Sequence, residues 1–358
     1  MESENAVAIL HQGHAPPVIG GIRKPLKPGG YADSSADIAF ALNSAGVPVI
    51  TPMPDPDPAE DRGWSFPDTT EGIADAISQG ARILWANTVL YEGHPIEQAL
   101  HAGISIVGQE PANVGLFDDK RYTNARLHAA GLPVARACVV GDYEATDLKD
   151  WQALTEPFLR QLGLELPVIV KPIRGRGSTG VQKAETWAEL RSALETLLSE
   201  PEVYGTAALI EEYLVGQEIT ISVLPPAAEF PVYRSLPPVV RVGHQAGVVP
   251  YSGKVSIVQN SRLLLPQEIQ GELQELCRYC ERAAALVGAR MVIRIDCRQD
   301  TQGNWKMFDL NMKPNLTGAG RPGRDNEDSL VTMAAYGFDR DYPTLLKELL
   351  KLAWTYSR

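Results

Sequence analysis

Residues 166–181 read LPVIVKPIRGRGSTGV, and the segment after the glycines of this stretch distinguishes two kinds of nucleotide-binding fold. An apolar run ends at Lys171, and Gly175–Gly180 then matches the spacing GxGxxG. In a dinucleotide-binding fold, such a loop leads directly into a helix whose first N–H groups meet the pyrophosphate. Here the next segment, VQKA, has the composition of a strand, and a helix begins only after Thr186. The pattern predicts a glycine-rich hairpin whose N–H groups, with Lys171 and Ser178, bind phosphates. The alternative is an ordinary glycine turn.

Two strands are predicted in the segment ALIEEYLVGQEITISVL (208–224), with a break near Gly216. Glu211 and Glu218 flank this break, and Leu214 lies between them. A carboxylate cannot help to bind phosphates, but it accepts hydrogen bonds from an adenine amino group or from ribose hydroxyls. The segment therefore suits the nucleoside end of a nucleotide. Taken alone, it also suits a solvated acidic edge.

Two later strands carry a second polar cluster. Arg294 and Asp296 lie in the segment MVIRIDCR, and Asp309 and Asn311 lie in WKMFDLNM. Because side chains alternate along a strand, each pair shares one face. Two carboxylates and an amide oxygen are hard ligands that suit Mg²⁺ or Mn²⁺, and the alternative is cross-strand polar pairing. Arg294 is either the ion-pair partner of these acids or a clamp for the charge of phosphoryl transfer.

The N-terminal segment alternates predicted strands and helices. Apolar runs such as AVAIL (6–10) and ARILWAN (81–87) alternate with helical segments such as SADIAFALNSAG. This alternation predicts a parallel sheet covered by helices, with a site at the carboxyl ends of the strands. The loop over residues 12–33 is long, and its content fits either a functional loop or a disordered flap. The histidines, including His11 and His14, have no spacing that requires a metal or base role.

Composition excludes several classes of protein. The chain has 358 residues, enough for two or three folding units, and no apolar run of transmembrane length. A net charge of -11 argues against general nucleic-acid binding. The first residues, MESENAVAIL, are acidic where a signal peptide would be basic, so we expect a cytoplasmic protein. Cys277 and Cys280 occupy the apolar stripe of a helix predicted over about residues 268–287, which favours core packing over a redox or zinc site.

The order of these motifs resembles the ATP-grasp superfamily, and most closely the D-alanine–D-alanine ligases and their relatives. The segments DDK, AAGLPV, VIVKP with its glycine loop, IEEYLVGQE, RID and DLN occur in that family's order. The resemblance covers about Phe117 to the last residue and implies an α/β (α+β grasp) fold. It implies an N-terminal parallel α/β domain (1–115) and two subdomains that sandwich ATP. These are a central one with the glycine-rich loop (116–208) and a C-terminal one with the metal site (209–358).

The resemblance also implies a role for each matching position. For the phosphates, it implies that Lys120 and Lys171 hold the α- and β-phosphates and that Ser178 lies in the loop that covers them. For the nucleoside, it implies that Glu211 binds adenine, Leu214 contacts the base through its backbone, and Glu218 binds the ribose. Met307 is implied to form the floor of the adenine pocket. Lys254 resembles the mobile-loop lysine that reaches the γ-phosphate, and Arg294 resembles the arginine that stabilises phosphate and oxyanion. The implied ligands of two Mg²⁺ (or Mn²⁺) ions are Asp296, Asp309 and Asn311.

The activity implied by the resemblance is ATP-dependent ligation. A substrate carboxylate attacks the γ-phosphate of ATP, and an amine then displaces phosphate from the resulting acyl phosphate, with release of ADP. The positive clamps and metal ions offset the charge on the transferred group. The family also implies a homodimer. We expect small-molecule amino-acid substrates and neither a nucleic-acid nor a membrane partner.

The sequence departs from the family in its substrate pockets. The long insert over residues 12–33 replaces a short glycine loop, and Asp309 stands where the family has Glu. Further replaced positions are Gly177 for a serine, Val255 for a tyrosine, and Lys313-Pro314-Asn315 for serine-proline-glycine. We therefore expect a carboxylate–amine ligase that joins other amino acids or amines in specialised metabolism. The alternatives are a genuine D-alanine–D-alanine ligase and a catalytically silent ATP-binding regulatory protein.

Four further residues are candidate substrate ligands. Arg321 and Arg324, in the insert TGAGRPGRDNEDS, suit bidentate binding of a substrate carboxylate or are exposed surface arginines. Asn315 lies four residues after the predicted metal ligand Asn311 and is a candidate oxyanion donor. Ser329 ends the insert and completes this set.

Overall fold

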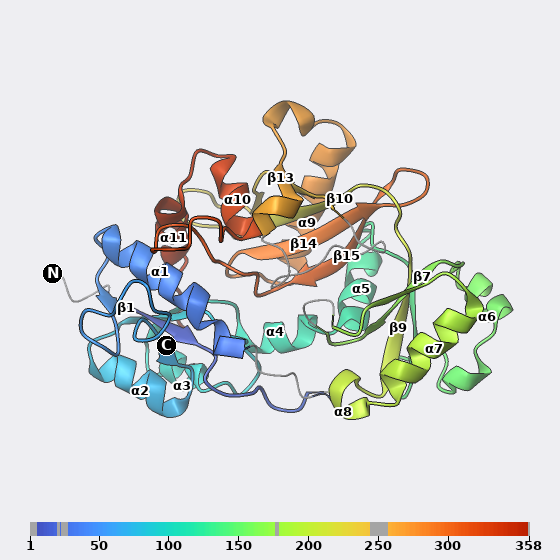
Figure 1. Cartoon of the computed structure of the whole chain (residues 1–358), viewed down its shortest axis with the longest axis horizontal. Coiled ribbons are helices and arrows are strands. Elements are labelled where there is room, and N and C mark those ends of the chain that lie inside the picture. The colour runs from blue at the N-terminus through green and yellow to red at the C-terminus, as the bar shows by residue number, and fades with distance from the viewer. Residues whose placement is uncertain (1–5, 20–21, 23–27, 176–178, 244–256, 357–358) are drawn as a thin grey trace.

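The computed structural model describes residues 6–19, 22, 28–175, 179–243 and 257–356 (Figure 1). Three sheets organise this part of the chain. A parallel sheet and its helices lie at one end, a four-stranded sheet lies at the other end, and a six-stranded sheet lies between and above them (Figure 1). No helix of the described residues is both long and apolar enough to cross a membrane.

The N-terminal sheet is parallel and has the order β2-β1-β4-β5, with β3 beside β1. Its strands are β1 (Val7–His11), β2 (Val49–Ile50), β3 (Phe66–Pro67), β4 (Ile83–Ala86) and β5 (Ser105–Val107). The helices that come after these strands are α1 (Ala32–Ser44), α2 (Thr70–Ser78), α3 (Ile96–His101) and α4 (Pro111–Phe117). Residues 7–10 are fully buried because helices cover both faces of β1. The predicted parallel α/β unit is confirmed.

The four-stranded sheet is antiparallel, in the order β6-β9-β7-β8. Its strands are β6 (Ala137–Gly141), β7 (Val168–Pro172), β8 (Gln182–Ala184) and β9 (Ala207–Glu212). Its helices are α5 (Lys120–Ala129), α6 (Glu156–Gln161), α7 (Trp187–Leu198) and α8 (Pro201–Tyr204). α7 begins at a capping box made by Thr186 and Glu189, and its apolar stripe of Leu190, Leu194 and Leu197 packs onto this sheet. The predicted strand before the glycine-rich loop, and the strand and helix after it, are confirmed as β7, β8 and α7.

The six-stranded sheet is antiparallel, in the order β13-β12-β10-β14-β15, with β11 beside β10. Its strands are β10 (Glu218–Leu224), β11 (Arg234–Ser235), β12 (Val239–Arg241), β13 (Ser261–Leu263), β14 (Ile293–Gln299) and β15 (Trp305–Asn311). Its helices are α9 (Glu272–Leu286), α10 (Leu330–Tyr336) and α11 (Tyr342–Leu350). Cys277 and Cys280 are buried where α9 packs on the sheet, as the apolar stripe predicts.

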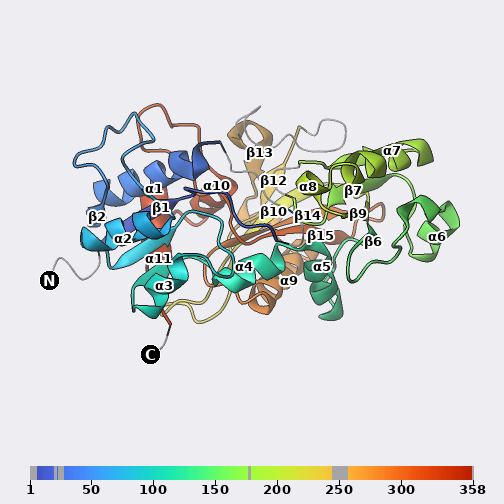
Figure 2. The ribbon, with the colours of Figure 1, turned by 90° about the horizontal axis from the view of Figure 1, so that it is seen from below.

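The first and last parts of the chain are fastened together. Residues Ile106 and Trp354 form a β-bridge, so the C-terminal segment pairs with the N-terminal sheet. α11 lies against α1, which Figures 1 and 2 both show. Strand β9 crosses the predicted boundary at residue 208 and pairs with both β6 and β7. The division into three domains stays a prediction.

Candidate active site

A buried ion pair joins two strands of the four-stranded sheet. Lys171 lies near the end of β7 and Glu211 lies on the neighbouring strand β9, where the register pairs Glu211 with Ile169. The ammonium of Lys171 donates to Glu211 Oε2 at 2.7 Å, and both side chains are almost fully buried. Burial raises the pKa of Glu211, and the nearby charge of Lys171 only partly offsets this. Glu211 Oε1 is buried and has no hydrogen-bond partner among the described residues, so it is an acceptor left for another donor.

Lys171 also contacts the six-stranded sheet, at a β-bulge. β14 and β15 pair Asp296 with Asp309 and Cys297 with Met307, so Phe308 is the extra residue between them. The carbonyl oxygen of Phe308 accepts a hydrogen bond from Lys171 Nζ at 3.2 Å. Lys171 therefore bridges the two antiparallel sheets.

A second lysine also reaches the six-stranded sheet. Lys120 begins α5, which Asp119 caps by accepting from the N–H of Tyr122. The ammonium of Lys120 lies 3.0 Å from Asp309 Oδ1. It also donates at 3.2 Å to the carbonyl of Gly175, at the start of the glycine-rich loop. Burial opposes both charges, but their mutual attraction prevails, so the pKa of Lys120 is raised and that of Asp309 is lowered.

Asp296 is held by an arginine on its own strand. Arg294 Nε and Nη2 donate to the two oxygens of Asp296 at 3.0 and 2.9 Å, and Thr220 Oγ1 donates to Oδ1 at 2.7 Å. Burial raises the pKa of Asp296, and the guanidinium of Arg294 opposes that rise. The structure thus brings together Arg294, Asp296, Asp309 and Asn311, because Arg294 lies opposite Asn311 in the same ladder.

The donor set fits a magnesium ion whose ligands come partly from these residues and partly from phosphate. Among the described residues, no group of three or more His, Cys, Asp or Glu side chains could hold a metal ion by itself. Two carboxylates and the oxygen of Asn311 leave half of an octahedral shell to water or phosphate oxygens, and Mg²⁺ usually keeps such ligands. Asn311 Oδ1 also accepts from the N–H of Lys313 at 3.0 Å, which orients the amide.

Three predicted nucleoside-side residues lie at the edge of this arrangement. Leu214 and Met307 are buried. The backbone of Met307 pairs with Pro133 and Ala135, which ties the segment before β6 to β15. Glu218 begins β10 and lies 3.7 Å from Arg298. Ser178 and Lys254 lie outside the described residues.

A family comparison matches most of this region. The family model described as "D-ala D-ala ligase C-terminus" matches residues 127–349. The chain belongs to this family. The D-alanine–D-alanine ligase of Haemophilus influenzae (strain PittEE) is 34% identical over 200 residues, which cover 56% of this chain and 61% of that relative. The Actinobacillus succinogenes ligase is 28% identical over 252 residues, covering 70% and 73%.

Solved structures share the fold of this family member over nearly its whole length. The D-alanine–D-alanine ligase of Bacillus anthracis, complexed with ATP, superposes with a TM-score of 0.63 at 15% identity and covers 96% of this chain and 95% of that one. The VanG D-Ala:D-Ser ligase of Enterococcus faecalis has a TM-score of 0.63 at 14% identity, covering 98% and 99%. The predicted fold class and the resemblance to the ATP-grasp D-alanine–D-alanine ligases are confirmed.

The structure does not bring the four predicted substrate ligands of this ligase-family chain to the lysines and acids. The side chain of Arg321 is 1% exposed, so it is not a surface arginine, and every N–H of its guanidinium donates within the protein. Its acceptors are the carboxylates of Asp37 and Asp61 and the carbonyls of Asp33, Pro58 and Glu60. Arg324 also binds Asp37, at 2.8 Å. Both arginines therefore fasten the insert to α1, and Arg321 also fastens it to the segment after β2.

The other two predicted substrate ligands make local hydrogen bonds. Ser329 is buried and caps α10, since its hydroxyl accepts from the N–H of Thr332. Asn315 donates to Thr317 Oγ1 at 3.1 Å and accepts from the N–H of Leu316. These contacts give both side chains a role in shaping the loop after β15.

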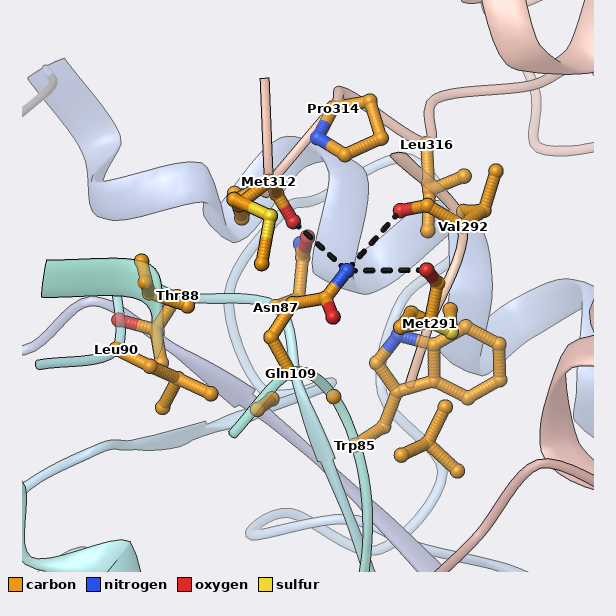
Figure 3. A pocket seen from close by; sticks show the side chains of 15 residues that line it. Trp85, Asn87, Thr88, Leu90, Gln109, Met291, Val292, Met312, Pro314 and Leu316 are labelled. Carbon is orange, nitrogen blue, oxygen red and sulfur yellow. Dashed lines mark hydrogen bonds between the residues drawn. The ribbon is translucent and has the colours of Figure 1, made fainter. Parts of the chain in front are cut away.

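A small cavity lies between the N-terminal sheet and the loop after Asn311 (Figure 3). Gln109 crosses it: its amide nitrogen donates to the carbonyls of Met291 and Met312 at 3.0 and 3.1 Å, and these bonds are drawn in Figure 3. Asn87 lines the same cavity from the end of β4, and its side-chain oxygen has no partner among the described residues. Neither residue was predicted, because each is a single polar residue after an apolar strand.

A cluster around Asp68 was also missed. Asp68, His14 and Tyr91 come from loops after three parallel strands, β3, β1 and β4. The expectation of unspecialised histidines rested on sequence spacing, and spacing does not report neighbours in a parallel sheet. A usable signal was present for His14 and Tyr91, since each comes after a predicted strand at the sheet edge where sites form.

Proposed function

We propose that this protein is an ATP-dependent carboxylate–amine ligase that joins an amino acid to an amine or a second amino acid. The observation that carries the proposal is the pair of lysines that cross between the two antiparallel sheets, each ion-paired with an acid. Both lysines lie at the start or end of elements that flank the glycine-rich loop. This arrangement suits the phosphates of ATP bound between the predicted subdomains 116–208 and 209–358.

The charges of the site support a role for metal as well as ATP. The cations Lys120, Lys171 and Arg294 are already matched by the carboxylates Glu211, Asp296 and Asp309. A polyanion such as ATP therefore needs further positive charge, which bound Mg²⁺ and the predicted γ-phosphate ligand Lys254 would supply. Asp296, Asp309 and Asn311 would hold the metal, whose chemistry here is to neutralise charge on the phosphate oxygens.

The remaining residues would orient ATP and the reacting groups. Lys120 and Lys171 bind the α- and β-phosphates, with Ser178 in the covering loop. The unpaired Oε1 of Glu211 accepts from the adenine amino group, Glu218 accepts from the ribose, and Leu214 and Met307 contact the base. Arg294 stabilises the phosphate and the oxyanion while it also binds Asp296.

The reaction is consistent with this placement. A carboxylate oxygen of the first substrate attacks the γ-phosphorus, and the bond from that phosphorus to the β,γ-bridging oxygen breaks to release ADP. The amine of the second substrate attacks the acyl carbon, loses a proton and expels phosphate. Closure of the subdomains keeps water from hydrolysing the acyl phosphate. We expect small amino-acid substrates and a homodimer in the cytoplasm.

A second candidate is D-alanine–D-alanine ligation itself. The curated relatives that match the chain carry that name, and this favours it. The replaced substrate-side residues, including Lys313 and Asn315, favour different substrates. A panel of amino acids separates the two candidates.

The test is ADP and phosphate release from Mg²⁺-ATP with single and paired L- and D-amino acids, with mass spectrometry of the products. We expect one amino acid to stimulate ADP release and a second to increase it, with an amide as product. D-alanine alone giving the dipeptide would establish the second candidate. Release of AMP, or ATP binding without turnover across the panel, would contradict ligation through an acyl phosphate. Asp296→Asn serves as the inactive control.

A further inference from the structure

Asp68 is a buried carboxylate held by groups from two loops. It lies directly after β3, and its side chain is 2% exposed. Gly13 N–H donates to Oδ1 at 2.8 Å, and Thr88 Oγ1 and His94 Nε2 both contact Oδ2, the imidazole at 3.2 Å. Burial opposes the charge, but these hydrogen bonds outweigh it and lower the pKa of Asp68. Asp68 is therefore a fixed negative charge at the carboxyl edge of the parallel sheet.

The hydrogen bonds fix the tautomer of His94. Its Nδ1 accepts from the backbone N–H of Ile96 at 3.1 Å, so its proton lies on Nε2 and points at Asp68. The ring is fully buried. His94 thus orients the carboxylate and has no nitrogen left for another task.

His14 differs because its second nitrogen faces a tyrosine. His14 Nδ1 lies 3.3 Å from Asp68 Oδ1 without a hydrogen bond between them, and the negative charge of the carboxylate favours the tautomer with its proton on this nitrogen. In the neutral ring Nε2 is then the bare nitrogen, and it lies 2.8 Å from the hydroxyl of Tyr91. Tyr91 must donate to it. Burial, helped by Asp68, raises the pKa of Tyr91, so its hydroxyl keeps the proton that this bond needs.

Tyr91 also lines a small groove next to the proposed phosphate site. The groove is lined by Tyr91, Pro16, Ile19 and Leu90, and also by Asp118 and Arg174. Arg174 Nη2 lies 3.2 Å from Asp119, which caps the helix that begins at Lys120. Tyr91 therefore shares the groove with Arg174, the residue that precedes Gly175 at the start of the glycine-rich loop. The walls of the groove are mostly apolar.

We propose that Tyr91 and His14, oriented by Asp68, accept the proton that the amine loses when it attacks the acyl phosphate. The N–H bond of the attacking amine breaks and an O–H bond forms at Tyr91. The original phenol proton moves to His14 Nε2, and the imidazolium beside Asp68 later returns a proton to solvent. No phenolate accumulates, and the carboxylate keeps its charge throughout. In this scheme the base takes its proton from the nucleophile, and a buried acid fixes the orientation of the base.

The inference rests on the proposed ligase function, and hydroxylamine separates the two. Hydroxylamine is an uncharged nucleophile at neutral pH and needs little help from a base, so it traps an acyl phosphate as a hydroxamate. The probe reaction uses the amino acid that gives the fastest ADP release in the unmodified protein. Amide formation with the second substrate of the panel is measured in parallel.

The decisive variant is Tyr91→Phe, which keeps the ring and removes the hydroxyl. We expect its amide formation to fall about 100-fold or more, while hydroxamate formation stays within about threefold of the unmodified protein. Raising the pH should recover part of the amide rate, because hydroxide can then accept the proton that the amine loses. The titratable and charged groups that face the pair are His94, Asp68, Asp118 and Arg174. His14→Gln should behave in the same way. Matched controls are Tyr279→Phe, which removes a hydroxyl from a half-buried residue on α9, and His101→Gln, which alters an exposed residue on α3.

Each other outcome has a definite meaning. Equal loss of both reactions in Tyr91→Phe and His14→Gln, with unchanged thermal unfolding, would assign the cluster a structural role and overturn the inference. Both reactions unchanged would overturn it as well. If Tyr91→Phe does not fold, the ratio of the two rates in His14→Gln decides the matter. An unmodified protein that forms no hydroxamate would overturn the proposed function, and the inference with it.

Discussion

Asp296 and Asp309 lie directly opposite each other on β14 and β15, yet each carboxylate is held by a different cation. Arg294 binds Asp296 from the same strand, whereas Lys120 reaches Asp309 from α5. Like charges in facing positions repel each other, and the two cations offset that cost. The carboxylates of Asp296 and Asp309 therefore suit a further positive charge placed between them.

Replacing either acid tests its proposed role in metal binding. Asp296→Asn and Asp309→Asn each remove a negative charge and a hard oxygen ligand. We expect Mg²⁺-dependent ADP release to fall about 100-fold in each, with a higher Mg²⁺ concentration needed for half-maximal rate. Titration of Mg²⁺ against the rate measures both effects. Asp142→Asn, at an exposed acid, is the control, and an unchanged Mg²⁺ dependence in either site variant would refute metal binding there.

The Lys171–Glu211 pair should be strongly coupled to stability. Lys171→Met leaves a buried carboxylate without its partner, at a cost of about 3–5 kcal/mol in the free energy of unfolding. Glu211→Gln in the same chain removes the stranded charge and should recover much of this loss. Urea denaturation measures all three proteins.

An exposed ion pair with the same nitrogen–oxygen distance provides a matched control. Lys183 and Glu185 also lie 2.7 Å apart, but the carboxylate is 64% exposed. Lys183→Met should change stability by less than about 1 kcal/mol, because water replaces the lost partner. Equal losses in the two lysine variants would show that burial does not set the energy of the Lys171 pair.

Arg321 should behave as a structural residue. Arg321→Lys keeps the charge but cannot satisfy the acceptors that the guanidinium serves on Asp37, Asp61 and the neighbouring carbonyls. We expect a loss of about 2–4 kcal/mol in the free energy of unfolding, at about 1–3 kcal/mol for each buried group left unpaired. The KM values of the folded variant should stay within about twofold. A large KM change without a stability change would restore the substrate role, and Arg82→Lys, at an exposed site, is the control.

His11 should make stability depend on pH near neutrality. Burial lowers its pKa below the ordinary value of 6.5, although Asp68 attracts the charged form. Below about pH 6.5 the unfolded chain therefore binds a proton that the folded chain does not, so stability falls as the pH falls. His11→Gln should flatten this dependence in urea titrations between pH 5.5 and 7.5 (about one unit on either side of the ordinary value). A slope that the substitution leaves unchanged would assign the effect to another group.

Local patterns predicted the elements of the fold well. Alternating and apolar runs placed β7, β9, β10, β14 and β15, and the helix predicted to begin after Thr186 is α7. Period two along the strands also placed Arg294 and Asp296 on one face. These features depend on residues close in sequence, which a single chain displays directly.

Contacts between distant segments were not predictable in the same way. The Lys171–Glu211 bond depends on β9 lying between β6 and β7, an order that no local pattern encodes. Arg321 was interpreted as a substrate ligand or a surface residue because the insert shows no periodicity, whereas its burial results from the packing of α1. Asp68 lies on a segment between β3 and α2 that gave no strand signal.

Gln109 binds the C-terminal part of the chain through backbone carbonyls at Met291, Val292 and Met312, and it accepts from the backbone N–H of Arg290. Every residue type offers those same backbone groups, apart from the missing N–H of proline. The hydrogen bonds of Gln109 therefore do not depend on which side chains stand at these four positions. A substitution at Met291, Val292 or Met312 would change the wall of the cavity in Figure 3 and the packing of the buried core, while the same hydrogen bonds could still join the two parts of the chain.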